Sequence, residues 1–124
     1  MYLEGGFALI SNRINITKAQ RKELIEKLHN ASNNKIFFIR RDEMTGKDPY
    51  TFFAEVGIDY SDAIKIIKNL SFEEYQYALL DSKNQYTEMF VFNKKINDKI
   101  AYIKIGFRSD KTVVISFHEK MYDE

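Results

Sequence analysis

The stretch that most constrains this chain runs from residue 99 to residue 120, where two runs of β-branched and aromatic residues flank the polar break 108–111. β-branched and aromatic residues favour strands and polar residues favour turns, so the pattern is typical of a β-hairpin. We place its loop at Ser109 to Lys111. Alternation along the strands then gives one apolar side, which carries Ala101, Ile103, Ile105, Phe107, Val113, Ile115 and Phe117.

The other side of the predicted hairpin is polar. With this loop, Tyr102 faces His118 across the two strands, and Lys104 faces Ser116. A phenol, an imidazole, an amine and a hydroxyl on one side of a rigid hairpin are able to carry acid–base chemistry. The same residues also suit an ordinary solvated sheet face. The residues of the hairpin alone leave both interpretations open.

The composition favours one folded domain over residues 1–124, with residues 1–16 as an extra N-terminal arm. Of the 124 residues 44% are hydrophobic, which is enough to form a single core. The absence of cysteine excludes disulfides and thiolate metal sites. No apolar run is long enough to span a membrane, so we expect a cytoplasmic protein without a membrane partner. A net charge of +1 argues against a broad nucleic-acid-coating surface but allows a local basic groove.

Helical periodicity and capping signals predict helices over residues 18–30, 61–70 and 72–80. Strands are predicted over 35–41 and 86–92, followed by a turn at 93–98 and then the hairpin. Residues 51–56 suit either a short strand or a helical turn. The expected fold class is α+β: an antiparallel sheet, made of a C-terminal three-stranded meander plus an N-terminal strand, packed by about three helices.

Several sequence motifs of enzymes are missing. The chain has no glycine-rich phosphate loop, no serine nucleophile elbow and no HExxH sequence. Its two histidines, His29 and His118, stand far apart along the chain. We therefore expect neither a metal site nor a cofactor.

Three segments, in order along the chain, resemble the MqsR family of toxin endoribonucleases. Residues 70–77 (LSFEEYQY) are similar to the family's LSxxDFYK, and 101–105 (AYIKI) to its YLKI. Residues 114–120 (VISFHEK) are similar to its IVSFKEK. With the preceding helix included, the MqsR-like part spans 58–120.

This resemblance implies a RelE-like α+β fold and the toxin of a type II toxin–antitoxin pair. It further implies a metal-independent endoribonuclease that cleaves single-stranded mRNA, in which the ribose 2′-OH attacks the adjacent phosphorus. The implied partners are the mRNA substrate and a cognate antitoxin protein that silences the toxin. The oligomeric state is left open.

The resemblance carries catalytic roles onto three residues: Tyr102 matches the family's active-site tyrosine, whereas His118 and Tyr77 stand where the family has lysines. A histidine both accepts and donates a proton near neutral pH, so it is able to replace a lysine. The family's glutamine falls on Met89 by ungapped spacing, and Phe90 follows it.

Positive side chains on and near the hairpin and the predicted strand 35–41 are candidates for binding RNA. They are Lys104, Arg108, Lys120, Arg40 and Arg41. Solvated strand ends explain the same charges. An alternative function follows from Met89 and Phe90, which would make the surface more apolar: a non-catalytic MqsR-like module that has lost its nuclease residues and binds another protein.

Overall fold

The computed structural model describes residues 12–40, 46–81, 86 and 88–121. Within these residues three α-helices form, with two short 3-10 turns: α2 (Lys18–His29), α3 (Pro49–Val56), α4 (Tyr60–Lys68), η1 (Asn33–Lys35) and η2 (Phe72–Glu74). The strands are β1 (Arg13–Ile14), β2 (Ile36–Phe38), β3 (Tyr75–Leu80), β4 (Glu88–Ile96), β5 (Lys99–Arg108) and β6 (Lys111–Glu119).

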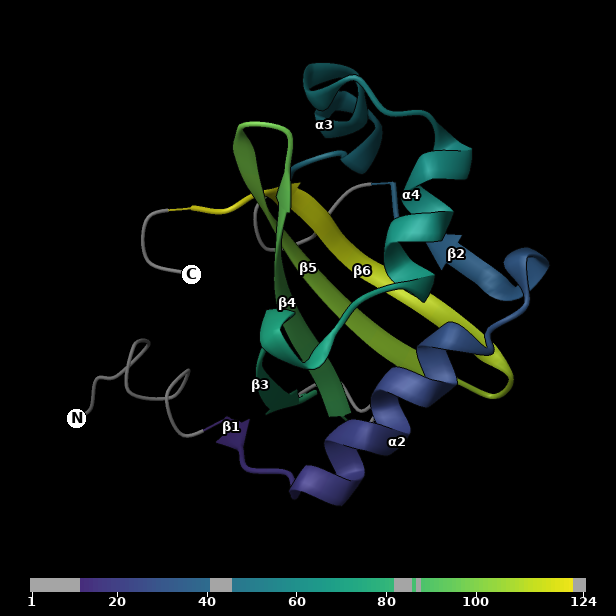
Figure 1. The fold of residues 1–124 in the computed structure, drawn as a ribbon, viewed down its shortest axis with the longest axis vertical. Helices are drawn as coiled ribbons and strands as arrows, with labels where there is room; N and C mark the ends of the chain where they lie inside the picture. Colours follow the sequence, from purple (N-terminus) through teal and green to yellow (C-terminus); the bar gives the residue numbers. More distant parts are fainter. Residues whose placement is uncertain (1–11, 41–45, 82–85, 87, 122–124) are drawn as a thin grey trace.

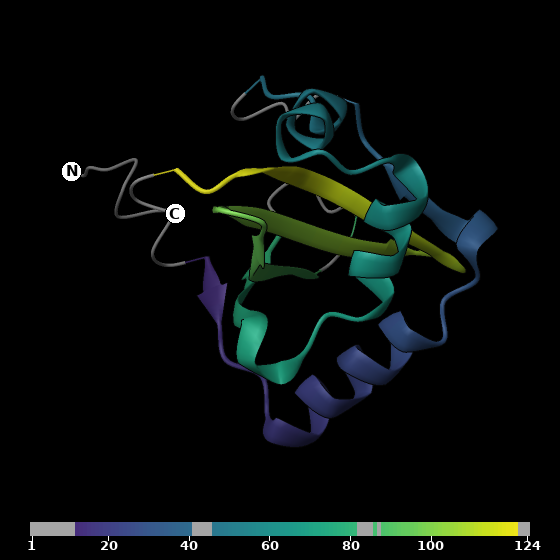
Figure 2. The ribbon, with the colours of Figure 1, turned by 45° about the horizontal axis from the view of Figure 1, so that its top comes forward.

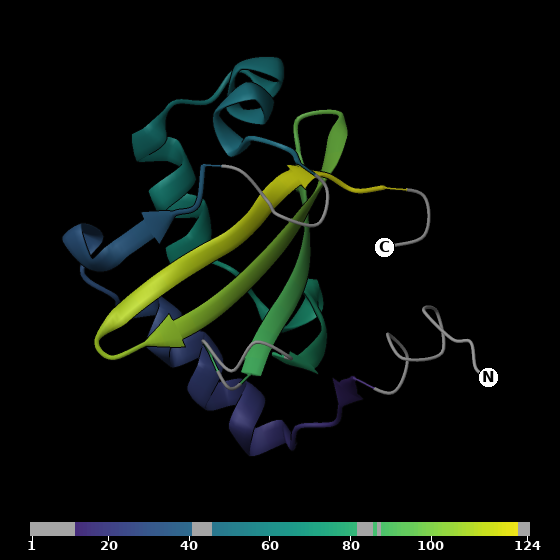
Figure 3. The ribbon, with the colours of Figure 1, turned by 180° about the vertical axis from the view of Figure 1, so that it is seen from behind.

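These strands form one sheet in the order β1-β3-β4-β5-β6-β2 (Figure 1). All neighbours pair antiparallel except β2, which runs parallel to β6. The helices lie on one face of the sheet, with α4 between α3 and α2 (Figure 2), and the view from behind has the strands in front (Figure 3). The predicted α+β class is confirmed. The strand predicted over 35–41, which forms as β2, pairs in parallel with β6 and not antiparallel. Of the predicted arm 1–16, residues 1–11 lie outside the described residues.

The helix starts follow from local hydrogen bonds. The Gln20 amide N–H donates to the Thr17 hydroxyl at 3.0 Å, and the Thr17 amide N–H donates to the Gln20 side chain at 2.7 Å. This reciprocal pair is the predicted capping box of α2. Asp48 caps α3 by accepting from the Tyr50 amide, and Pro49 occupies the first turn, where its missing N–H costs nothing. Residues 51–56 are therefore helical.

The prediction of a helix over 72–80 is wrong. Ser71 and Glu74 do form the expected capping box, but only the single turn η2 follows it. From Tyr75 the chain is extended and pairs with β4 as strand β3. Cross-strand pairing of aromatic and apolar side chains outweighs the helical spacing of three residues, since β-propensity depends on the available neighbours.

The predicted turn at 93–98 is also too long. Strand β4 continues to Ile96, so the reversal uses only Asn97 and Asp98. Asn97 has φ 58°, in the left-handed region that asparagine tolerates better than most residues. The extra strand residues bring Asn93 into register with Tyr102.

The β5–β6 hairpin has a shorter loop than predicted, because Arg108 pairs with Lys111. Ser109, with φ 56°, makes the tight turn. A bulge leaves Ile115 without a partner opposite β5, and this extra residue restores the predicted pairing of Tyr102 with His118. It also moves Val114 onto the apolar side, where Val113 had been predicted.

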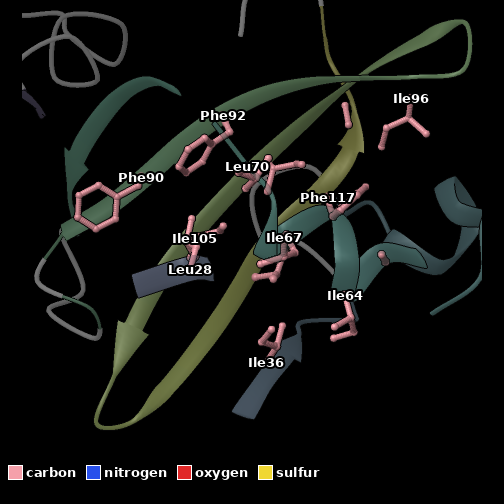
Figure 4. Packing of buried hydrophobic residues seen from close by; sticks show 14 of the residues in the cluster. Leu28, Ile36, Ile64, Ile67, Leu70, Phe90, Phe92, Ile96, Ile105 and Phe117 are labelled. Carbon is pink, nitrogen blue, oxygen red and sulfur yellow. The ribbon is translucent and has the colours of Figure 1, made fainter. Parts of the chain in front are cut away.

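The core lies between the sheet and the helices (Figure 4). Phe92, Ile103 and Phe117 from three adjacent strands are almost fully buried there. Leu28 of α2 and Ile67 of α4 cover them from the helical layer. The apolar stripes predicted for α2 and α4 therefore meet the apolar side of the hairpin.

Candidate functional site

The candidate site lies on the side of the sheet that faces away from the core, here called the second face. Alternation along the strands puts Tyr102 and Lys104 of β5 on it, opposite His118 and Ser116 of β6. On the other side of β5, Asn93 of β4 pairs with Tyr102. Three adjacent strands thus place an amide, a phenol and an imidazole in one row.

The rings of Tyr102 and His118 stack, with centroids 5.2 Å apart and planes inclined by 22°. Their exposed fractions are only 7% and 2%. The predicted juxtaposition of these two residues is confirmed, and an ordinary solvated face is excluded for them. Stacked aromatic rings in a buried setting hold each other in one orientation, as a site requires.

A hydrogen bond at the end of β6 sets the tautomer of His118. Its Nδ1 lies 2.9 Å from the carbonyl oxygen of Glu119. Because a carbonyl oxygen only accepts, Nδ1 carries the proton and donates it. In the neutral ring Nε2 then bears the lone pair, so the nitrogen able to take up a proton is fixed by the fold.

Lys104 occupies the next row of the second face. It pairs with Val91 on one side and with Ser116 on the other, and both of these neighbours are buried. The lysine itself is half-buried. Within the described part of the chain no carboxylate lies within ion-pair distance of it. Its positive charge is therefore available to an anionic ligand beside the stacked rings.

Asn93 belongs to this site although the sequence indicated a turn there. The sequence comparison had put the family's amide side chain at Met89. Met89 instead pairs with Gly106, two residues beyond Lys104 on β5. The side chain of Asn93 is half-buried, and its Oδ1 is buried without a hydrogen-bond partner in the described residues. The length of β4 was the missing signal, since ungapped spacing cannot show where a strand ends.

Tyr77 lies on the second face too, beside Val91 and therefore two strands from Lys104. The guanidinium carbon of Arg13 sits 3.8 Å from the centre of its ring. This cation–π contact ties β1 to β3. Arg13 is exposed and adds a positive charge that the sequence reasoning did not single out.

The other predicted RNA-binding residues lie at different points of the fold. Arg108 is exposed at the far end of β5. Lys120 follows β6, and its amide donates to the Ile100 carbonyl at 2.7 Å. Arg40 is on the helical side, where it contacts Asp48 at 3.4 Å. Arg41 lies outside the described residues.

Phe90 corrects one premise of the protein-binding alternative. Its side chain points into the core, where it is 9% exposed and contacts Phe107. Only Met89 of the pair is on the second face, and it is half-buried. The apolar surface expected from these two residues is therefore not formed.

Within the described ranges no three His, Asp or Glu side chains are grouped to hold a metal ion. The helices in the same ranges are too short and too polar for any of them to cross a membrane.

Comparison with known proteins identifies a family for this chain. A family model described as motility quorum-sensing regulator, toxin of MqsA, matches residues 39–119. That range contains β3 to β6 and all of the paired rows from Tyr77 to His118. No curated protein and no solved structure gave a match. The family match covers well over half of the chain and indicates a toxin of a toxin–antitoxin system. The chain belongs to the MqsR toxin family.

Proposed function

We propose that this toxin is a metal-independent endoribonuclease that cleaves single-stranded mRNA and is silenced by a cognate antitoxin. The observation that carries the proposal is the stacked, buried pair of Tyr102 and His118, with Lys104 beside it. A proton acceptor, a proton donor and a fixed positive charge are what RNA cleavage by the ribose 2′-OH requires.

In the proposed reaction His118 acts as the base and Tyr102 as the acid. Nε2 of His118 takes the proton from the 2′-OH, and the freed oxygen attacks the adjacent phosphorus. The bond from phosphorus to the 5′-oxygen breaks, and the phenol of Tyr102 protonates that leaving oxygen. The products are a 2′,3′-cyclic phosphate and a 5′-hydroxyl. Lys104 neutralises charge on the phosphorane, and the Asn93 amide donates a hydrogen bond to it.

Burial of His118 imposes a condition on this scheme. With 2% of its surface exposed, the imidazole meets a phosphate only after RNA binding has opened the second face. We therefore expect diethyl pyrocarbonate to modify exposed His29 before His118 in the free protein. Faster modification of His118 would show a more open site.

The direct test uses a labelled single-stranded RNA in buffer containing EDTA. The wild type should cut it into fragments with 2′,3′-cyclic phosphate ends. His118→Phe keeps the ring stack but removes the base, and should slow cleavage by about 10²- to 10⁴-fold. His29→Phe, a change of the same kind on the exposed side of α2, is the matched control and should cut normally.

Two results would refute the nuclease proposal: wild-type protein that leaves RNA intact, or equal cleavage by His118→Phe. Circular dichroism of the variant separates loss of chemistry from loss of folding. Growth arrest on expression, relieved by the antitoxin, is the expected cellular result. An uncut RNA together with tight antitoxin binding would favour a non-catalytic binding module.

A further inference from the structure

A surface cleft of about 480 Å³ opens at the other end of the second face, beside the β5–β6 turn. Its lining combines two aromatic rings with two positive side chains, and consists of Phe37, Tyr86, Arg108, Ser109, Lys111 and Val113. β2 and the turn of the hairpin lie at the same end of the sheet (Figure 3). The mechanism above uses none of the aromatic residues in this cleft.

Phe37 is the exposed wall of the cleft. It lies on edge strand β2, pairs with Val113 of β6 and is 44% exposed. Its neighbours Ile36 and Phe38 point to the core side, where Phe38 contacts Phe53. A large aromatic ring left on the surface beside a cleft is available to stack on a flat ligand.

Tyr86 also lines the cleft, and the sheet leaves space for its ring. A Cβ atom at Gly106 would lie 2.7 Å from Cγ of Tyr86, closer than any real side chain allows. The absence of a side chain at position 106 therefore lets the phenol ring rest directly on β5. This contact orders Tyr86 on the same face as Phe37.

The two cations of the cleft remain available to a ligand. Nζ of Lys111 is 5.5 Å from the centre of the Phe37 ring, and Arg108 is paired with Lys111 across the turn. Within the described residues neither has a carboxylate at ion-pair distance. The adjacent carboxylate, Asp110, instead binds Nζ of Lys35 at 3.0 Å. The cleft thus joins exposed aromatic surface to two cations that no described carboxylate contacts at ion-pair distance.

We propose that this cleft binds one base and the adjoining phosphate of single-stranded RNA. The base stacks on Phe37 against Tyr86, and Arg108 and Lys111 bind the phosphate. The inference rests on the proposed function and adds a second contact point for its substrate. Arg108 is the sixth residue after Tyr102 on β5, which places it about 20 Å farther along the strand. The strand of RNA therefore runs along the second face from one point to the other.

A protein ligand fits this cleft less well. β2 is only three residues long, so its free edge gives little length for an added strand. The cations are placed over and beside an aromatic ring, an arrangement that suits alternating bases and phosphates.

The test measures binding by fluorescence anisotropy of a 2′-O-methyl RNA of about ten nucleotides, which lacks the attacking 2′-OH. Phe37→Leu removes the aromatic face and should weaken binding about tenfold, whereas Phe37→Trp should restore it. Phe72→Leu changes a phenylalanine of similar exposure, 42%, on η2, and should have no effect. Lys111→Gln should reduce the slope of log binding constant against log salt concentration by about 0.7. Lys22→Gln, at an exposed position of α2, should leave that slope unchanged.

Cleavage assays separate this inference from the nuclease proposal. A dinucleotide is too short to reach both points, so Phe37→Leu should cut it normally while cutting longer RNA more slowly. If the wild type cuts neither substrate but Phe37→Leu still loses RNA binding, the nuclease proposal fails and the cleft stands. Unchanged RNA binding by Phe37→Leu overturns the cleft. Unchanged RNA binding with loss of antitoxin binding assigns it to the protein partner instead, which also overturns the inference.

Discussion

The two faces of the sheet bury different kinds of side chain. On the helix-covered face, Phe92, Ile103 and Phe117 fill the space below the helices with apolar surface only. On the second face, Tyr102, Ser116 and His118 are buried nearly as deeply, although all three carry polar groups. Buried polar groups cost free energy unless they are partnered, so they add less stability than apolar ones. The second face therefore contributes less stability than the helix-covered face and holds its polar groups in fixed positions.

The largest expected effect compares two residues of the same strand, one on each face. Phe92→Ala removes a fully buried ring that contacts Tyr75 edge-on, and should lower the free energy of unfolding by about 3–5 kcal/mol. Met89→Ala, on the second face and half-buried, should cost no more than about 2 kcal/mol. Urea unfolding of both variants gives the values. Equal losses would mean that the two faces contribute alike to the core.

A smaller effect of opposite sign is expected on the second face itself. Asn93→Leu removes the buried Oδ1 that accepts no hydrogen bond from the described residues, and adds apolar surface. The free energy of unfolding should rise by about 1 kcal/mol. Cleavage should slow in the same variant, because the amide beside Tyr102 is lost. A lower free energy of unfolding in this variant would show that contacts within the fold stabilise the amide. It would count against a cost in stability at this position.

The sequence predicted the hairpin and the meeting of Tyr102 with His118, because alternation along strands is a strong local signal. The register was obtained from a loop one residue too long, and the bulge at Ile115 compensated for it. Neither the turn length nor the bulge leaves a clear mark in the sequence. Asn93 was missed for the same reason: its place depends on where β4 ends.

The segment 72–80 shows a different limit. Its capping box forms as predicted, yet the chain leaves the helix after one turn, and Tyr75 and Leu79 come to lie on opposite faces of the sheet. What decides is the neighbouring strand β4, whose position follows from the rest of the sheet. The cleft at Phe37 was out of reach as well, because it needs β2, Tyr86 and the hairpin turn to come together.

The smallest effect concerns the ion pair of Lys35 and Asp110. It joins the residue before β2 to the β5–β6 turn and belongs to neither face of the sheet. The hydrogen bond and charge of Lys35 lower the pKa of Asp110 from its ordinary value. A carboxyl whose pKa is depressed by folding stabilises the protein above its unfolded pKa, and this contribution disappears as pH falls through the folded pKa. Asp110→Asn should therefore slightly lower the unfolding temperature at pH 7, with the difference from the wild type fading below about pH 4. The effect is small because the Asp110 side chain is exposed, so water and salt screen the pair. A difference that persists unchanged into acid would show that the hairpin turn depends on the shape of Asp110 and not on its charge.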